Sequence, residues 1–295
     1  MTEKVHKAGF VNILGNPNVG KSTLMNALVG EKLSIITSKA QTTRHRIMGI
    51  VNGEDFQIVY SDTPGILAPK YRLQESMLRF VDTAFTDADV ILYVTDVKEK
   101  ADKHQKYIDK ITKSPVPILV LLNKIDLSNQ QEVETLVGGW HEILPLAQVI
   151  PVSAIEKFNL EPVLGKVLEL LPESPPYFPK DELTDKTERF FVSEIIREKI
   201  FLNYQKEIPY SVEVEVESFK DEANIVKIAA VIYVARETQK GIIIGRGGTM
   251  LKKVGTEARK DTEGFLGKKV FLEIFVKVKK DWRDSDYQLK RFGYQ

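Results

Sequence analysis

The chain contains no cysteine, and no apolar run in it approaches the length of a membrane-spanning helix, which is about 20 residues. The first absence excludes disulfide frameworks, zinc ribbons, iron–sulfur clusters and thiol catalysis, and the second argues against an integral membrane protein. The basic start, Met1–Lys7, leads into only a short apolar run, Ala8–Leu14, that ends in a glycine loop. We therefore expect no export signal and a cytoplasmic address.

The length and the overall charge set wide bounds. With 295 residues, the chain is longer than one hydrophobic core usually needs, which favours two domains. Its net charge of +1 says little about nucleic-acid binding, because local basic patches rather than chain averages meet phosphate groups.

Short β-branched runs alternate with helical segments from residue 8 to about residue 171, which is typical of a parallel sheet covered by helices on both faces. The pattern predicts an α/β domain with a mostly parallel wound sheet over residues 1–172. The predicted strands are Gly9–Leu14, Ile47–Val51, Gln57–Ser61, Val90–Thr95, Ile118–Leu122 and Val149–Val152. Helices are expected to begin near Gly20, Leu73, Lys103, Gln130 and Asn159.

Four prolines within Leu171–Pro179 prevent a helix or a central strand there, and we place a domain linker at residues 173–186. Beyond it the predicted elements follow the order α-β-β-α-α-β. This order predicts a second, smaller α+β domain over residues 187–295.

The segment after the first predicted strand has the phosphate-loop pattern G-x-x-x-x-G-K-[ST] and leads into a predicted helix. Glycines let backbone N–H groups face phosphates, and the helix N-terminus adds its dipole. We expect Lys21 to reach the β- and γ-phosphates and Ser22 to offer its hydroxyl group to Mg²⁺. The predicted phosphate-loop residues are Gly15, Asn16, Pro17, Asn18, Val19, Gly20, Lys21, Ser22 and Thr23.

The third predicted strand ends in a D-x-x-G motif. Its carboxylate, Asp62, is expected to hold Mg²⁺ through water, and the amide of Gly65 is expected to meet the γ-phosphate. Loss of that phosphate would release the segment that follows, which makes the segment a switch. The residues assigned to the nucleotide here are Asp62, Thr63, Pro64, Gly65 and Ile66.

The motif Asn123–Asp126 selects the base. Asp126 can accept from both N1–H and the exocyclic amine of guanine, a pattern that adenine does not offer, so the ligands should be GTP and GDP. Asn123 is expected to tie this loop to the phosphate loop, with the stem of Lys124 along the base. The backbone of Ser153 and Ala154 is expected to donate to guanine O6. All these motifs follow strands, at the sheet edge where open α/β folds bind ligands.

A polar segment before the second predicted strand is the natural first switch. A threonine there can close over Mg²⁺ and the γ-phosphate, and we prefer Thr43 to Thr42 because Thr43 directly precedes Arg44. Ser22, Thr43 and, through water, Asp62 form the predicted Mg²⁺ site. Arg44 or Arg46 is a candidate internal arginine finger. The predicted switch residues are Gln41, Thr42, Thr43, Arg44 and His45.

Ile66 stands where many small G proteins carry the glutamine that orients the attacking water, so the water must be placed otherwise. Intrinsic hydrolysis should be slow, on the order of 10⁻⁴ to 10⁻² s⁻¹. The side-chain oxygen of Asn18 can hold a monovalent cation, K⁺, against the phosphates, and this charge would serve in place of an arginine finger.

In the second domain, an apolar helix breaks at a G-x-x-G loop and restarts as a basic helix. Such a loop lets two helix ends approach a sugar–phosphate backbone while a neighbouring apolar groove receives unstacked bases, as in KH domains that bind single-stranded RNA. The aromatic and basic residues of the C-terminal tail are compatible with two roles: a surface that stacks on bases and binds phosphates, or packing on their own domain. The predicted RNA-binding residues are Ile243, Ile244, Gly245, Arg246, Gly247, Gly248, Lys252 and Lys253.

The chain closely resembles the Era family of GTPases in G-N-P-N-V-G-K-S, Q-T-T-R-H-R-I, D-T-P-G-I, N-K-I-D, G-R-G-G and the tail Val276–Arg283. The resemblance covers nearly the whole chain and implies a P-loop G domain followed by a type II KH domain. It also implies binding near the 3′ end of small-subunit ribosomal RNA, help in late maturation of the small ribosomal subunit, and peripheral contact with the inner membrane. We expect a monomer.

Two other interpretations stay open at the level of sequence. One is a regulatory G protein that acts on protein partners through its second domain, although Arg246 in the G-x-x-G loop argues against it. The other is a nucleotide-binding scaffold that hardly hydrolyses GTP, which Ile66 favours.

Overall fold

The chain divides into two compact units, one built mostly from residues 5–185 and one built around residues 186–294. The computed structural model describes residues 5–99 and 105–294. The predicted helix start near Lys103 and the beginning of Met1–Lys7 therefore lie outside the described residues. Within the described ranges, no helix combines the length and the apolar composition that crossing a membrane requires.

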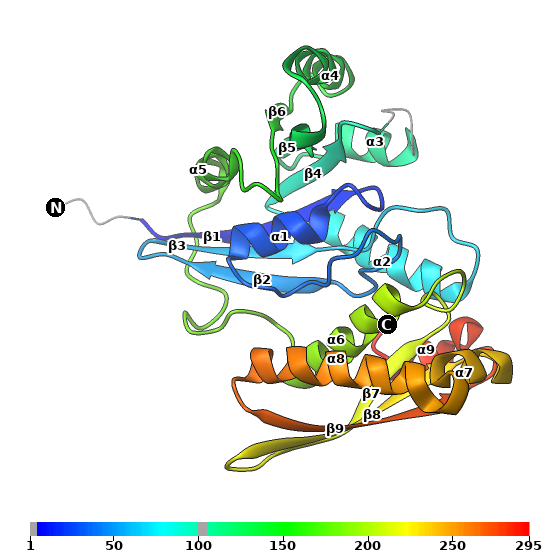
Figure 1. Cartoon of the computed structure of the whole chain (residues 1–295). Coiled ribbons are helices and arrows are strands. Elements are labelled where there is room, and N and C mark those ends of the chain that lie inside the picture. The colour runs from blue at the N-terminus through cyan, green and yellow to red at the C-terminus, as the bar shows by residue number, and fades with distance from the viewer. Residues whose placement is uncertain (1–4, 100–104, 295) are drawn as a thin grey trace. The chain divides into compact units, whose positions relative to one another are not determined.

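Six strands form the sheet of the first unit in the order β2-β3-β1-β4-β5-β6, and Figure 1 shows them side by side. Strand β2 runs antiparallel to β3, and the other neighbouring pairs are parallel. The central strands are buried and apolar, as parallel strands covered on both faces usually are. The strands are β1 (Lys7–Gly15), β2 (Ile47–Asn52), β3 (Phe56–Asp62), β4 (Val90–Asp96), β5 (Ile118–Asn123) and β6 (Gln148–Pro151).

Helices close the core of this unit. Helices α2, α3 and α4 share one cluster of buried side chains with strands β1, β4 and β5, which includes Val81, Ile108 and Trp140. Helix α1 packs along β1, β2 and β3. This architecture confirms the predicted wound α/β domain. The helices are α1 (Lys21–Val29), α2 (Arg72–Thr86), α3 (Gln105–Thr112), α4 (Gln130–Ile143) and α5 (Leu160–Leu170).

The predicted linker, residues 173–186, runs mostly along the first unit. The N–H group of Ile50 donates to the carbonyl oxygen of Leu183 at 2.9 Å, and the side-chain amide of Gln57 donates to that of Phe178 at 2.8 Å. Prolines remove donors from this segment but leave its carbonyl acceptors, so it binds the neighbouring strands without becoming a regular strand itself.

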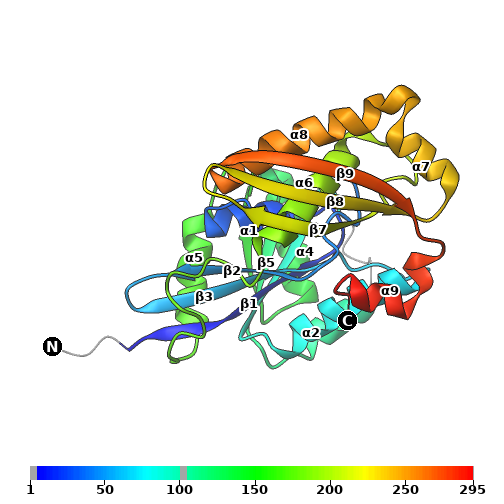
Figure 2. The same ribbon diagram turned by 90° about the horizontal axis from the view of Figure 1, so that it is seen from below.

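Three strands form the sheet of the second unit, with β8 antiparallel to β7 and parallel to β9. Helices α6, α7 and α8 share its core, which includes Ile196, Ile243 and Val254. Figure 2 shows α8 running along the three strands. The order α-β-β-α-α-β confirms the predicted α+β domain. The elements are α6 (Glu188–Asn203), β7 (Glu213–Asp221), β8 (Ile225–Val234), α7 (Glu237–Ile244), α8 (Thr249–Leu266) and β9 (Lys269–Val278).

The C-terminal tail packs on its own unit. Trp282 is fully buried, and its indole N–H donates to the carbonyl oxygen of Ser211 at 3.1 Å. The buried hydroxyl group of Tyr294 donates to the carboxylate of Glu213 at 2.7 Å. Tyr287, on helix α9 (Asp286–Arg291), is 75% exposed. Packing rather than base stacking therefore accounts for Trp282 and Tyr294.

Replacing Trp282 by alanine should destabilise the second unit by about 3–5 kcal/mol, because the change leaves a large cavity and an unpaired carbonyl oxygen. Urea unfolding of the full chain checks this, with Tyr287→Ala as the matched control on the exposed side of the tail. Equal unfolding curves for the two variants would contradict the packing of the tail.

Candidate functional site

The loop between β1 and α1 surrounds a buried lysine. The ammonium group of Lys21 donates to the carbonyl oxygens of Gly15 and Asn16 at 3.0 and 2.8 Å. Burial lowers the pKa of Lys21 to about 8, against the opposing charges of Asp62 and Glu99. An anion bound here would stabilise the charged form of Lys21, which burial disfavours.

Three oxygen-bearing side chains converge beside this lysine. The hydroxyl group of Ser22 donates to the carboxylate of Asp62 at 2.7 Å and lies 2.8 Å from the hydroxyl oxygen of Thr43. The Thr43 hydroxyl oxygen lies 3.3 Å from the same carboxylate oxygen. The second oxygen, Oδ1 of Asp62, is buried without a hydrogen-bond partner, and burial raises the pKa of this carboxyl group. The cluster thus has an unsatisfied acceptor where a cation would bind.

Thr42, Gln41 and His45 have contacts of their own. The hydroxyl group of Thr42 donates to the carbonyl oxygen of Lys39 at 2.7 Å. Gln41 accepts from the hydroxyl group of Tyr71 at 3.0 Å. The ring of His45 lies 6.0 Å from that of Phe80. Arg44 is buried.

The D-x-x-G segment contributes backbone rather than side chains. A Cβ on Gly65 would lie 2.7 Å from Cα of Pro17, so this position brings the switch against the phosphate loop. The hydroxyl group of Thr63 donates to the carbonyl oxygen of Ile13, and Pro64 is buried. The side chain of Ile66 lies in the core, and its N–H group donates to the carbonyl oxygen of Gly15 at 3.2 Å. The assignment of Ile66 to the nucleotide is therefore corrected: it is a core residue.

Asn123 ties three loops together. Its side-chain amide donates to the carbonyl oxygen of Val19 at 2.8 Å, and its side-chain oxygen accepts from the N–H group of Ala154 at 3.0 Å. A Cβ on Gly20, whose φ is 98°, would lie 2.3 Å from the Asn123 amide nitrogen. Only glycine fits at position 20, because both its backbone conformation and this contact exclude a side chain.

The exposed carboxylate of Asp126 is held by Ser153, whose hydroxyl group donates to it at 2.6 Å. The backbone N–H group of Ser153 donates to the carbonyl oxygen of Phe158 at 3.3 Å, and that of Ala154 donates to Asn123. Both groups that were expected to donate to guanine O6 therefore have acceptors within the protein. The side chain of Ser153 orients Asp126, and the backbone N–H group of Ala154 orients Asn123.

Two carboxylates at and just after the end of β4, Asp96 and Glu99, were not predicted as site residues from the sequence. Asp96 accepts from the ammonium group of Lys124 at 2.6 Å, and that ammonium also donates to the carbonyl oxygen of Asn18. Glu99 accepts from the side-chain amide of Asn16 and from the hydroxyl group of Thr95. The sequence could have indicated Asp96, because it lies at the carboxyl end of β4, between two strands that are followed by nucleotide motifs.

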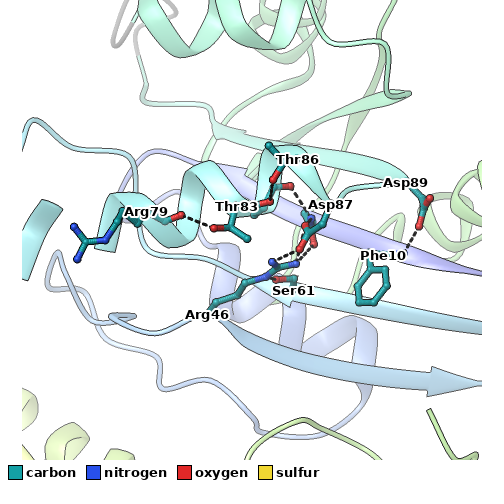
Figure 3. A network of polar contacts seen from close by, with 10 residues as sticks. Phe10, Arg46, Ser61, Arg79, Thr83, Thr86, Asp87 and Asp89 are labelled. Carbon is teal, nitrogen blue, oxygen red and sulfur yellow. Dashed lines mark hydrogen bonds and ion pairs between the residues drawn. The ribbon is translucent and has the colours of Figure 1, made fainter. Parts of the chain in front are cut away.

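Arg46 is not available as an arginine finger. Its guanidinium group is buried and forms an ion pair with Asp87. It also donates to the hydroxyl oxygen of Ser61 at 2.5 Å and to the side-chain oxygen of Asn12 at 3.0 Å. Figure 3 shows the side chain pointing along the sheet toward Asp87. The candidate role is corrected because these contacts occupy all three nitrogen atoms of the group.

In the second unit, the G-x-x-G loop has glycines where side chains fit poorly. Gly245, Gly247 and Gly248 have φ angles of 73°, 60° and 78°. Arg246 and Gly247 are exposed, and a Cβ on Gly247 would meet no atom within 4 Å. The loop therefore offers an open, uncluttered backbone to a large ligand.

A groove of about 400 Å³ begins at this loop and runs between α8 and β9. Lys252 lies in its wall, whereas Lys253 lies 3.9 Å from Glu257 in an ion pair and is not part of the wall. The groove residues of α8 recur at spacings of three and four residues, and this periodicity in the sequence could have identified the face of the helix that lines the groove. The lining residues are Gly248, Leu251, Lys252, Gly255, Thr256, Arg259, Leu272 and Ile274.

Ile243 is corrected from groove to core. Its side chain is fully buried, and its carbonyl oxygen accepts from the hydroxyl group of Tyr204 at 2.6 Å. Ile244 is partly exposed and Ile242 is 48% exposed. Because three consecutive isoleucines cannot share one helix face, the middle one turns into the core.

Comparison with known proteins identifies both units. A sequence model described as 50S ribosome-binding GTPase matches residues 10–124, and one described as KH domain matches residues 207–283. GTPase Era of Clostridium kluyveri is 44% identical over 291 residues, which cover 98% of this chain and 99% of its own. GTPase Era of Syntrophus aciditrophicus is 46% identical over 98% of this chain and 95% of its own.

The chain belongs to the Era family of GTPases. Its fold agrees with solved Era structures at a TM-score of 0.94. One is a crystal structure of Era with MgGDPNP and nucleotides 1506–1542 of 16S ribosomal RNA, 39% identical over 98% of this chain and 99% of that one. Another is an Aquifex aeolicus Era variant bound to GDP·AlF4⁻, 40% identical with the same coverage. The Era resemblance and the order of a G domain and a KH domain are confirmed.

Nucleotide affinity in this Era-family GTPase should fall as the pH rises through about 8, the lowered pKa of Lys21. Phosphate binding needs the protonated lysine, so GDP should bind roughly fourfold more weakly at pH 8.5 than at pH 7. Fluorescence titration with a labelled GDP measures this. Equal affinity at the two pH values would show that the protonation of Lys21 does not limit binding.

Proposed function

We propose that this GTPase uses the GTP-bound and GDP-bound states of its first domain to control binding of single-stranded ribosomal RNA by its KH domain. In this proposal the RNA lies near the 3′ end of the small-subunit RNA, and binding assists maturation of the small ribosomal subunit. The observation that carries it is the pairing, in one chain, of a guanine-type nucleotide site with an open G-x-x-G loop and groove.

The residues around Asp62 suit Mg²⁺. Hydroxyl and carboxylate oxygens are the ligands that Mg²⁺ prefers, and Oδ1 of Asp62 is a buried acceptor without a partner. When bound with GTP, Mg²⁺ would offset the negative charge of the β- and γ-phosphates. In the proposed site Ser22 and Thr43 would bind the ion and Asp62 would hold it through water, while Lys21 contacts the phosphates. Asn18, exposed in the phosphate loop, stays the candidate ligand for K⁺.

Guanine selection is proposed to rest on Asp126. Its carboxylate is exposed and is oriented by the Ser153 hydroxyl group, so it can face the base while Asn123 keeps the loop against Val19. Contact with the base would thus also stabilise the phosphate loop, because Asn123 connects the two loops.

Asp126→Asn should shift base preference from guanine to xanthine, because the amide donates where xanthine carries a carbonyl oxygen in place of the guanine amine. We expect loss of at least about tenfold in GDP affinity and a gain for XDP, because a polar group that the bound base covers without pairing it costs about 1–3 kcal/mol. Competition binding with both nucleotides measures the shift. Asp181→Asn, an exposed change outside the site, should keep the guanine preference.

RNA binding is proposed for the exposed G-x-x-G loop and the adjoining groove. Arg246 in the loop and Lys252 and Arg259 in the groove supply positive charge, and Leu251, Leu272 and Ile274 supply apolar surface for bases. The 16S RNA segment in the solved Era complex suggests which RNA to test. On the family resemblance alone, we further propose a monomeric cytoplasmic protein with peripheral contact at the inner membrane.

Gly247→Asp should abolish RNA binding and leave GTP hydrolysis intact, because a carboxylate in the exposed loop repels the RNA phosphates. Aspartate tolerates the positive φ of 60° at this position, so the fold should survive. Gly267→Asp is a matched control, since Gly267 has a φ of 64° and lies at the other end of α8.

The measurement is binding of an RNA copy of the small-subunit 3′ end across a salt series, with a GTP analogue or GDP present. Tight binding that is favoured by the GTP analogue and lost in Gly247→Asp is the expected result. Unaltered RNA binding in that variant would remove the role given to the loop, and no binding in any state would point to a protein partner instead.

A further inference from the structure

The buried guanidinium group of Arg46 uses all three of its nitrogen atoms. Both terminal nitrogens reach the carboxylate of Asp87, one of them at 3.0 Å. The Nε–H group donates to Ser61, and a terminal N–H group also donates to Asn12. Figure 3 shows these contacts between strand β3 and the end of helix α2. A buried charge with this many partners is held in one orientation.

Asn12 completes the network from the central strand β1. Its side-chain amide donates to the carbonyl oxygen of Ala84 at 2.7 Å and to Asp87 at 2.8 Å, while its oxygen accepts from Arg46. Ala84 belongs to the last turn of α2, and Asp87 follows that helix directly. The network therefore fixes the end of α2 to the sheet.

The same network borders two of the three side chains proposed to hold Mg²⁺. Ser61 immediately precedes Asp62, and Arg46 lies three residues after Thr43. In the sheet Ile47 pairs with Asp62 and Met48 pairs with Ser61, so the start of β2 and the end of β3 are neighbours. A shift of Arg46 would thus be transmitted to both oxygen-bearing side chains over one to three residues of backbone.

We infer that Arg46 is a positioning residue for the metal-binding oxygens of Thr43 and Asp62. It holds the beginning of β2 and the end of β3 in register by fastening both to Asp87. The ends of the two switch segments, at Arg46 and after α2, are thereby fixed to one another. This inference rests on the proposed Mg²⁺ site.

Lysine cannot reproduce this arrangement. Its ammonium group is a single point with three donors, whereas the planar guanidinium group reaches Asp87, Ser61 and Asn12 at the same time. Arg46→Lys therefore keeps the charge near Asp87 and removes the fork that connects the two strand ends.

The experiment measures affinity for a fluorescent GTP analogue in EDTA and in saturating Mg²⁺, with the full chain. Arg46→Lys should lower the Mg²⁺-dependent gain in affinity by about tenfold, the usual effect of losing a partner that orients metal ligands. Affinity in EDTA should change by less than about threefold, because the phosphate loop and Asp126 are left in place. Arg79→Lys is the control, since Figure 3 shows this exposed arginine on α2 pointing away from Asp87.

Two further variants keep the inference open to refutation. Ser61→Ala removes one hydrogen bond without disturbing the ion pair, and it should reduce the Mg²⁺-dependent gain in the same direction but less. Combining Arg46→Lys with Asp87→Asn should cost no more than the larger single effect, because the residues act as one unit. If Arg46→Lys does not fold, Ser61→Ala decides: a full gain there overturns the inference.

The outcomes separate the positioning role of Arg46 from the metal site itself. An unchanged gain in a folded Arg46→Lys variant, even with lower thermal stability, would overturn the positioning role and leave the metal site standing. Absence of any Mg²⁺-dependent gain in the unaltered chain would overturn the proposed metal site and this inference together.

Discussion

The burial of one carboxylate, Asp62, constrains the nucleotide-binding half of this protein. A buried charge must be paired or must coordinate a cation, and Asp62 meets this demand only in part through Ser22 and Thr43. Three segments far apart in sequence therefore end at the same point: the start of α1, the segment before β2, and the end of β3. Because these loops leave one oxygen of the Asp62 carboxylate without a partner, they are ready to bind a cation there.

The parallel sheet explains why the remaining parts of the site lie close by. Carboxyl ends of parallel strands meet at one edge, so the loops after β1, β3, β4, β5 and β6 become neighbours. Asn123 and Lys124 then fasten these loops to one another through Val19, Ala154 and Asp96. These bonds connect the loop of Asn123–Asp126 to the phosphate loop.

The KH domain separates its core from its groove within a single helix, α8. In α8, Val254 and Ala258 enter the core, whereas Leu251, Gly255 and Arg259 line the groove next to β9. The glycines before α8 hold the backbone in conformations that other residues rarely adopt, which keeps the entrance of the groove open. The core and the groove thus use different faces of the same helix.

The sequence by itself determined the family, the order of the two domains and the positions of the nucleotide motifs. These follow from local patterns: glycine spacing, strand–loop–helix order, and motifs at strand ends. The tertiary structure decided which side of a helix or strand each residue occupies and which charge it meets. Ile66 and Ile243 proved to be core residues, and Arg46 proved to be bound by Asp87, 41 residues away in sequence. The backbone N–H of Ala154 donates to the side-chain oxygen of Asn123, 31 residues away in sequence. Pairings of this kind depend on burial and on distances between remote segments, and no local pattern encodes them.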